Sequence, residues 1–167
     1  MELHEVGPQQ WDALIAGEQQ SWGGGAEEQL VWARKQRHVA VLDGEGVPLA
    51  LAGALVADVA VGDRRFAVVG IGSVIVTRAM RRRGLARVVI EAILAIARQL
   101  GPERAMLFCR TELTELYARF DFRPIAAAVT AEQPSGRIAM PMEAMWAPLA
   151  ARATWPAGEV AVLGEPF

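Results

Sequence analysis

The stretch from Leu85 to Leu100 carries the strongest structural signal in the chain, because its apolar residues recur at the three- to four-residue spacing of a helix. These residues are Leu85, Val88, Val89, Ala92, Ile93, Ile96 and Leu100. The pattern predicts an amphipathic helix, and the pair Gly101-Pro102 ends it.

Apolar runs typical of strands come before this helix. Rich in Ala, Val and Ile, they are His38–Leu42, Pro48–Val59 and Arg64–Val76. Glycine-containing turns separate them, so they predict an antiparallel meander. Gly70 and Gly72 within the third run indicate a bulge or a close backbone approach.

Shorter elements complete the expected fold. Strands are expected at Leu3–Val6, Ala105–Cys109, Arg123–Val129 and Arg137–Trp146, the last interrupted by Pro141. Helices are expected at Gln9–Gln20, Glu27–Lys35 and Leu113–Phe120, and the tail after Pro148 is expected to be irregular. This order predicts an α+β fold, a mixed α/β layered structure, in one domain over residues 1–167.

Composition narrows the class of protein. With 53% hydrophobic and 22% charged residues, the 167-residue chain has enough apolar side chains for one core. A formal net charge of -2 disfavours a nucleic-acid surface. The first residues lack a signal-peptide pattern and no apolar run reaches the ~20 residues of a membrane helix. We therefore expect a cytoplasmic protein without nucleic-acid or membrane partners.

The junction from Val74 to Arg87 is the segment most suited to bind a ligand. An apolar strand, Val74-Ile75-Val76, passes through an arginine-rich turn into the major helix. The start of a helix exposes unpaired N–H groups and positive charge, and the small residues Gly84 and Ala86 let a phosphate approach the backbone. The structural alternative is a tight turn whose arginines are solvated and bind no ligand. The junction lacks both the Gly-Lys-Ser/Thr of a nucleotide P-loop and the Gly-x-Gly-x-x-Gly of dinucleotide binders.

Two motifs resemble those of a known family. Arg81-x-x-Gly84-x-Ala86 is similar to the coenzyme A signature of GCN5-related N-acetyltransferases, the GNAT superfamily. Downstream, the run from Leu116 to Pro124 resembles the family's Leu/Phe-Tyr-x-x-x-Gly-Phe element, with Asp121 where glycine is usual. Asp tolerates the left-handed conformation that such a turn needs. The resemblance covers residues 36–128 best.

The resemblance implies a site and a fold. The GNAT fold would have a mostly antiparallel, twisted mixed sheet flanked by helices, with a V-shaped splay between strands 64–76 and 105–109. The coenzyme A motif would span 74–100, the second motif 105–124, and the acceptor site would use flanks 1–36 and 129–167. Acetyl-CoA, with no metal, would bind at Val74, Ile75, Val76, Arg81, Arg82, Arg83, Gly84, Leu85, Ala86 and Arg87.

The resemblance also assigns chemistry. The chain would transfer an acetyl group to a primary amine, with a backbone N–H such as that of Val74 stabilising the oxyanion and Tyr117 protonating the leaving thiolate. The structural alternative for Tyr117 is a core aromatic residue. The general base stays open, because strand residues 69–74 hold no carboxylate. Water, Glu112, Glu27 and Glu28 are the alternatives, whereas Cys109 is interpreted as a buried small hydrophobic residue.

A second, shorter resemblance concerns the identity of the acceptor amine. Trp155-Pro156-Ala157-Gly158-Glu159-Val160 is similar to the ending of aminoglycoside 2′-N-acetyltransferases. By position it implies that Glu159, with Glu132 nearby, contacts a cationic aminosugar. Trp22, beside the triple glycine, is interpreted either as part of a mobile lid over the acceptor site or as a hydrophobic anchor. The expected partner is a small-molecule amine, and the apolar strands are compatible with a homodimer. The alternatives are a peptide or protein amine as acceptor, and a non-catalytic acyl-CoA sensor.

Overall fold

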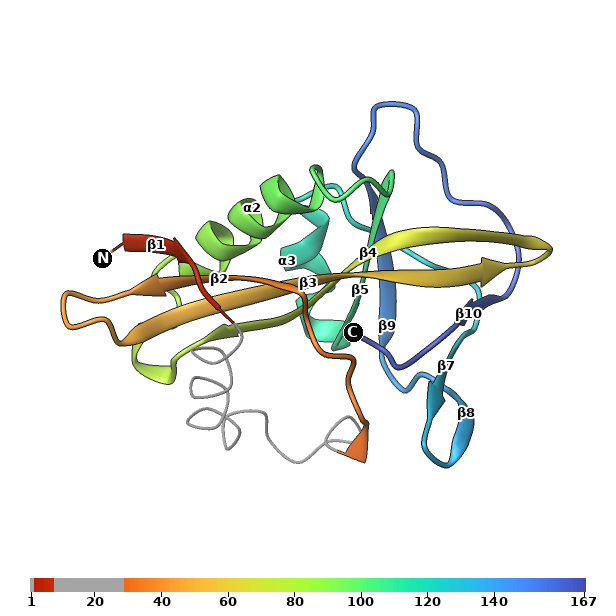
Figure 1. Ribbon diagram of the computed structural model, residues 1–167, viewed down its shortest axis with the longest axis horizontal. Helices are drawn as coiled ribbons and strands as arrows, with labels where there is room; N and C mark the ends of the chain where they lie inside the picture. The colour runs from red at the N-terminus through yellow and green to blue at the C-terminus, as the bar shows by residue number, and fades with distance from the viewer. Residues whose placement is uncertain (1, 8–28) are drawn as a thin grey trace.

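The computed structural model describes residues 2–7 and 29–167. One mixed sheet of ten strands dominates it, and Figure 1 shows its helices gathered on one side of the long central strands. The strands are β1 (Glu2–Glu5), β2 (Arg37–Leu42), β3 (Pro48–Val61), β4 (Arg64–Val76), β5 (Arg104–Cys109), β6 (Arg123–Pro124), β7 (Val129–Gln133), β8 (Gly136–Ala139), β9 (Glu143–Pro148) and β10 (Val160–Val162). The helical elements are η3 (Arg78–Met80), α2 (Leu85–Ala97), η4 (Thr111–Leu113) and α3 (Thr114–Ala118).

The sheet follows the order β6-β9-β5-β4-β3-β10-β7-β8, with β2 paired to β3 and β1 paired to β2. Strands β2, β3 and β4 form the expected antiparallel meander. Only the pairs β4–β5 and β10–β7 are parallel within the described chain. The predicted α+β architecture with a mostly antiparallel mixed sheet is therefore confirmed.

Helix α2 is confirmed, although it ends at Ala97 and Val88 of the expected apolar stripe is exposed. Its buried residues are Leu85, Val89, Ile90, Ile93, Leu94 and Ala97. They join residues of the central strands in the largest core cluster, which includes Val39, Ala52, Val69, Ile71 and Leu107. Burial of each large aliphatic side chain contributes about 1.5–3 kcal/mol, so this packing rather than helix propensity holds α2 in place.

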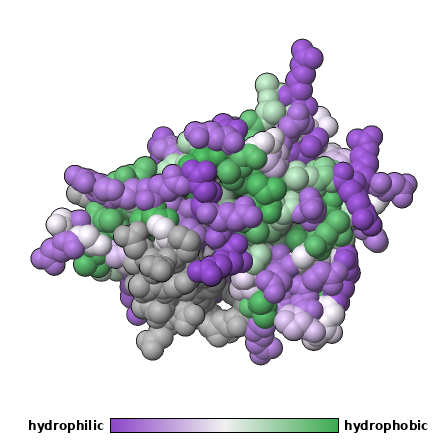
Figure 2. Space-filling model, in the orientation of Figure 1, coloured by the Kyte–Doolittle hydropathy of each residue, from purple (hydrophilic) through white to green (hydrophobic). Residues whose placement is uncertain are grey.

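The other face of the sheet carries a second core. Phe108, Val68, Met106 and Phe167 are buried there, together with residues from β7 and β10. Figure 2 shows hydrophilic side chains projecting around the edge of the viewed face, with hydrophobic ones between them. No helix in the described part of the chain is long and apolar enough to cross a membrane.

The helix expected at Glu27–Lys35 is wrong where the structure describes it. Residues 30–35 have no helical structure, and their main chain bonds to distant segments instead. The N–H of Val31 donates to Oε1 of Gln133 at 2.8 Å, and the N–H of Ala33 donates to the Pro166 carbonyl at 2.7 Å. These long-range partners replace the i→i−4 bonds of a helix. The helix expected at Gln9–Gln20 lies outside the described residues.

The C-terminal third also departs from expectation. The strand expected at Arg123–Val129 is reduced to β6, which pairs with β9, while residues 125–128 are irregular. The strand expected at Arg137–Trp146 divides at Pro141 into β8 and β9, which lie in different parts of the sheet, because proline interrupts a strand ladder. The tail expected to be irregular contributes β10, which is inserted between β3 and β7.

The two strand glycines mark both a close approach and a bulge, as expected. A Cβ atom on Gly70 would lie 2.4 Å from Cγ of Phe167, and one on Gly72 would lie 2.8 Å from Cε of Lys35. The pairing register between β3 and β4 shifts between Leu51 and Gly53. The tail and Lys35 thus fill the space that side chains at positions 70 and 72 would take.

Replacing Gly70 with alanine is expected to lower the free energy of unfolding by about 1–3 kcal/mol, because the added methyl group overlaps the Phe167 ring. Urea denaturation measures the change. The matched control is Gly44→Ala, where an added Cβ meets nothing within 4 Å. The Gly70→Ala change is expected to cost less in a Phe167→Ala background, and equal costs in both backgrounds would contradict the overlap.

Candidate functional site

Strands β4 and β5 part within their length. Their parallel pairing runs from Val69–Ala105 to Ile71–Leu107 and stops there, although both strands continue. In Figure 1, β5 crosses the direction of β4 steeply. Residues 72–76 of β4 therefore remain paired to β3 alone, and their β5-facing side is called the open side of β4 below.

A bulge redirects the main chain on this open side. Ser73 has φ 52°, and between the pairs Gly53–Gly72 and Leu51–Ile75 two β4 residues oppose one residue of β3. Beyond the bulge, the N–H of Thr77 donates to the Leu49 carbonyl at 3.0 Å. Since strand residues alternate in the side to which N–H and C=O point, Val76 presents its main-chain groups away from β3.

The start of α2 is an anion-binding arrangement. Gly84, the residue before the helix, has φ 82° and no side-chain cap, and the first turn holds no acidic residue. The first helical bond is from the Val88 N–H to the Gly84 carbonyl, so the N–H groups of Leu85, Ala86 and Arg87 have no helical acceptor. A Cβ on Gly84 would meet nothing within 4 Å, so the space beside this glycine is open. The backbone there fits a phosphate.

The arginines of the turn divide into two kinds. The side chain of Arg81 folds back and donates from Nε to the Val76 carbonyl at 3.3 Å, and that of Arg87 donates to Glu91 at 2.7 Å. Arg82 and Arg83 are exposed, and Arg82 takes a left-handed φ of 62°. Arg81 thus braces the turn, whereas Arg82 and Arg83 leave positive charge beside the helix start.

Tyr117 lies on α3, on the same side of the sheet as α2. Its side chain is buried in the main core, with its ring edge-to-face against Phe122 at a centroid distance of 5.9 Å. Burial raises the pKa of Tyr117 above its ordinary value, and Cys109 adds to the increase. The phenol is therefore protonated, and able to donate, throughout the neutral range.

The turn after α3 has the conformation expected from its sequence. Asp121 takes φ 64°, and the Phe122 N–H donates to the Tyr117 carbonyl at 3.4 Å. Asp at the glycine position of the motif thus ends the helix in a left-handed turn. That turn directs Phe122 back onto Tyr117.

Cys109 ends β5 as a buried residue, as expected. Its sulfur lies 3.9 Å from the sulfur of Met145. Burial raises the pKa of Cys109 to about 11, with smaller contributions from Glu143 and Glu112, so the thiol is un-ionised at neutral pH. Glu112 is exposed on η4, and Glu143, which pairs with Cys109 in the sheet, accepts from the Thr111 hydroxyl at 3.1 Å.

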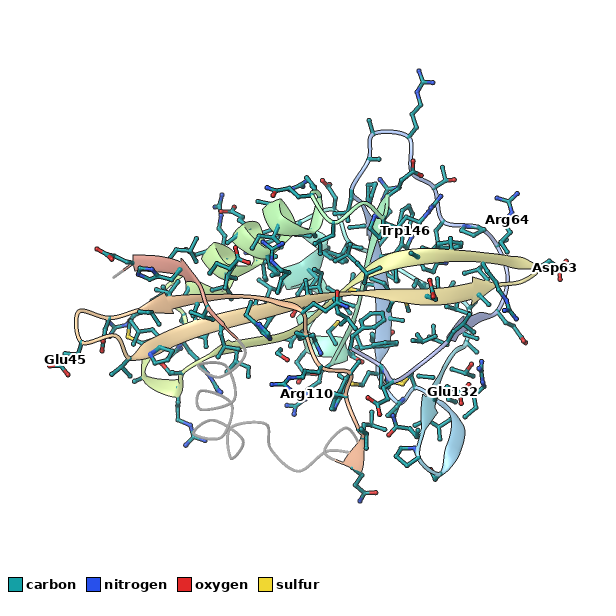
Figure 3. The ribbon with its side chains drawn as sticks, viewed as in Figure 1. Glu45, Asp63, Arg64, Arg110, Glu132 and Trp146 are labelled. Carbon is teal, nitrogen blue, oxygen red and sulfur yellow. The ribbon has the colours of Figure 1, made fainter. Side chains whose placement is uncertain are left out.

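The acidic residues expected at the acceptor site lie apart from the open side of β4. Glu159 accepts, through its carbonyl, from the N–H of Gly62 at the tip of the β3–β4 hairpin. Figure 3 shows that tip, marked by Asp63 and Arg64, at the opposite end of β3 from the β2–β3 turn that holds Glu45. Glu132 lies on the β7–β8 hairpin and is bonded to Arg137. Trp22, Glu27 and Glu28 lie outside the described residues.

Lys35 is a residue near the site that the motifs missed. It lies just before β2, only 6% exposed, and its Nζ donates to the Ala33 carbonyl at 2.9 Å. Burial lowers its pKa to about 8. A signal existed in the sequence, because Lys35 is the single lysine among 17 basic residues, the rest being arginine.

Lys35→Met is expected to raise the free energy of unfolding at pH 7 by an amount on the order of 3 kcal/mol. The lysine pKa is lower in the folded chain, about 8, than its ordinary value of 10.5, so the unfolded chain binds the proton more tightly between these values. The destabilisation caused by Lys35 is therefore complete below about pH 8, and it is relieved as the pH increases from about 8 to 10.5. Urea midpoints of both proteins at pH 7 and pH 10 measure this. A gap between them that is independent of pH would contradict it.

A sheet that opens beside a helix start with free N–H groups is suited to an extended, phosphate-bearing ligand. Residues 8–122 match the model of the acetyltransferase (GNAT) family, and the chain belongs to that family. It is accordingly an N-acetyltransferase. No curated protein matches the sequence closely enough to count as a relative.

Solved structures share the fold at low sequence identity. YhbS from Escherichia coli, a GNAT family N-acetyltransferase in complex with CoA, is 18% identical with a TM-score of 0.64, covering 99% of this chain and 94% of that chain. The ribosomal-protein-S18-alanine N-acetyltransferase from Escherichia coli is 16% identical with a TM-score of 0.60, covering 93% and 99%. An aminoglycoside 6′-N-acetyltransferase complexed with coenzyme A is 13% identical with a TM-score of 0.62, covering 92% and 100%.

Proposed function

We propose that this enzyme acetylates a primary amine of a small molecule, with the acetyl donor held along the open side of β4. The observation that carries the proposal is the end of β4–β5 pairing at Ile71–Leu107, beside a helix start with free N–H groups. A strand-like pantetheine arm fits an unpaired strand side, and a pyrophosphate fits the helix start.

The cofactor site uses the residues of the 74–100 motif. In the proposal the main chain of Val74 and Val76 faces the pantetheine arm, and the amides from Arg82 to Arg87 hold the pyrophosphate. Ile75 lies between them in the motif but is paired with Leu51 of β3, so its main-chain groups face β3. Arg81 acts indirectly, because its side chain is bonded to the Val76 carbonyl. Arg82 and Arg83 supply the exposed positive charge. Residues 105–124 supply Tyr117, and the flanks 1–36 and 129–167 form the acceptor side of a single domain.

Acetyl-CoA supplies an activated acetyl group. The residues of the chain bind this group, stabilise the charge that develops on it and transfer protons. In the proposal a backbone N–H of the bulged segment, such as that of Val74, donates to the carbonyl oxygen as negative charge develops. Tyr117, kept protonated by burial, donates to the departing sulfur. Both groups belong to rigid elements, the sheet and α3.

The acceptor is proposed to be a small molecule because a compact pocket lies beside the end of β5. It has a volume of about 240 Å³ and is lined by Ile125, Ala126, Ala127, Ala128, Val129, Met140, Met142, Glu143 and Ala144. An aminosugar is one proposed class, supported by the Trp155–Val160 resemblance. In the proposal the aminosugar extends away from β4 to reach Glu159 and Glu132. Glu159 lies at the β3–β4 hairpin tip, and Glu132 is bonded to Arg137.

Two measurements test the proposal. Acetyl-CoA is expected to raise the melting temperature, because it binds the native chain alone. A panel of aminoglycosides, polyamines and peptide N-termini, followed by free-thiol release, is expected to identify a small-molecule acceptor. Stabilisation without thiol release from any amine would indicate the acyl-CoA sensor, and exclusive use of peptides would indicate the protein-amine alternative. Light scattering tests the proposed homodimer.

A further inference from the structure

The side chain of Lys35 ends at the point where β4 becomes unpaired from β5. Its Cε lies 2.8 Å, and its Nζ 3.3 Å, from the position that a Cβ on Gly72 would occupy. Gly72 follows Ile71, the last β4 residue paired with β5. The amine is therefore buried against the strand segment that carries the proposed acetyl site.

Lys35 lies on the face of the sheet opposite α2 and Tyr117. Val69 and Ile71 pack with α2, so the alternating residues Gly70 and Gly72 face the other way, toward Phe167 and Lys35. The thioester, held between β4 and β5, would then have the phenol on one side and the lysine amine on the other. An acceptor amine must therefore approach the thioester from the side that neither acetyl-CoA nor Tyr117 occupies.

We propose that Lys35 is the general base, taking a proton from the ammonium group of the acceptor before attack. This inference rests on the proposed function and supplies the base that β4 lacks, since residues 69–74 contain no carboxylate. A buried amine suits this role because lysine, unlike arginine, loses its proton when desolvated. Of the 17 lysine and arginine residues, Lys35 is the one lysine and all the rest are arginine.

The proton and bond changes balance. One proton passes from the acceptor ammonium to Nζ of Lys35 and then to solvent. The neutral amine forms the C–N bond as the C–S bond breaks, and the nitrogen's second proton reaches the coenzyme sulfur through Tyr117. The products are an amide and a free thiol, and neither side chain is consumed.

The groups around Lys35 are consistent with a neutral amine. From β4 it faces Gly72, and from the tail it faces Phe167, whose carbonyl carbon lies 2.8 Å from the same Cβ position. His38 of β2 lies in the same cross-strand row, through its pairing with Gly53 and that of Gly53 with Gly72. Burial is the cause of the lowered pKa, and no side-chain carboxylate of the described residues contributes to it.

The first test exploits the single lysine. In chain labelled with [ε-¹³C]lysine one side-chain resonance is expected, and its titration should have a midpoint near 8. The pH profile of kcat/KM for an amine found in the panel should show an acidic limb with the same midpoint. In Lys35→Met that limb should disappear and kcat should fall roughly 10²–10⁴-fold, while acetyl-CoA still raises the melting temperature.

Matched variants separate the base from other roles. Lys35→Arg keeps the charge but cannot deprotonate, so it should be as inactive as Lys35→Met. A variant with two glycines appended after Phe167 lacks any free carboxyl group at that position and should keep the acidic limb. If this variant loses the limb while Lys35→Met keeps it, the proposal is overturned.

Other outcomes overturn the base role in distinct ways. Full activity of Lys35→Met, or a titration midpoint of Lys35 near 10.5, would exclude Lys35 as the general base while leaving the proposed function intact. If mass spectrometry showed that incubation with acetyl-CoA alone adds one acetyl group to Lys35, this residue would be an acceptor and not the base. A wild-type chain that acetylates no amine at all refutes the proposed function, and the base role with it.

Discussion

Replacing Gly84 with glutamate is expected to weaken acetyl-CoA binding by roughly 100-fold or more while the fold is kept. The glutamate side chain would start in the open space beside Gly84, next to the residues whose N–H groups are free, Leu85, Ala86 and Arg87. Its charge would repel phosphate oxygens and take their hydrogen-bond donors. Isothermal titration with acetyl-CoA measures the affinity, and circular dichroism checks the fold.

A matched variant separates charge from backbone strain at Gly84. The φ of 82° is left-handed, so any side chain other than those of Asn and Asp is strained there. Gly84→Asn tolerates this conformation without adding charge, and it is expected to bind within about tenfold of the original affinity. Equal losses in both variants would point to strain, and no loss in Gly84→Glu would place the phosphates elsewhere.

Tyr117→Phe is the second change with a large expected effect, a fall in kcat of roughly 10²–10⁴-fold. The phenylalanine ring keeps the edge-to-face contact with Phe122, so the melting temperature and the affinity for acetyl-CoA should change little. Steady-state thiol release measures kcat, and titration measures affinity.

The pH dependence provides a control for Tyr117. Because burial raises its pKa above the ordinary value of 10, the phenol should cause no loss of kcat at any pH below about 10. An alkaline limb well below pH 10 that disappears in Tyr117→Phe would show a lowered pKa in the working enzyme. Unchanged kcat in Tyr117→Phe would leave the hydroxyl without a role in proton transfer.

The parts of the fold predictable from sequence were those set by local pattern. The 3.6-residue period of α2 and the apolar runs of β2, β3, β4 and β5 gave their positions to within a few residues. The cofactor turn was predictable for the same reason, since Gly84 and its neighbours are contiguous. In each case the information lies within one element.

The missed parts depend on partners that are distant in sequence. Residues 30–35 are not helical because Gln133 and Pro166, distant in sequence, accept hydrogen bonds from their main chain. β10 is a strand because β3 and β7 lie on either side of it. The approach of Lys35 to Gly72 required the folded chain, although a single lysine among 17 basic residues was a readable hint.

The placement of β10 has a consequence for biosynthesis. The outer edge of β3 is covered by β2 along its first half and by β10 near residues 59–61. On the ribosome the first half is covered early, but residues 59–61 keep unpaired main-chain groups until Val160–Val162 emerge, about a hundred residues later. That stretch of nascent chain is therefore where strand pairing with another molecule competes with folding.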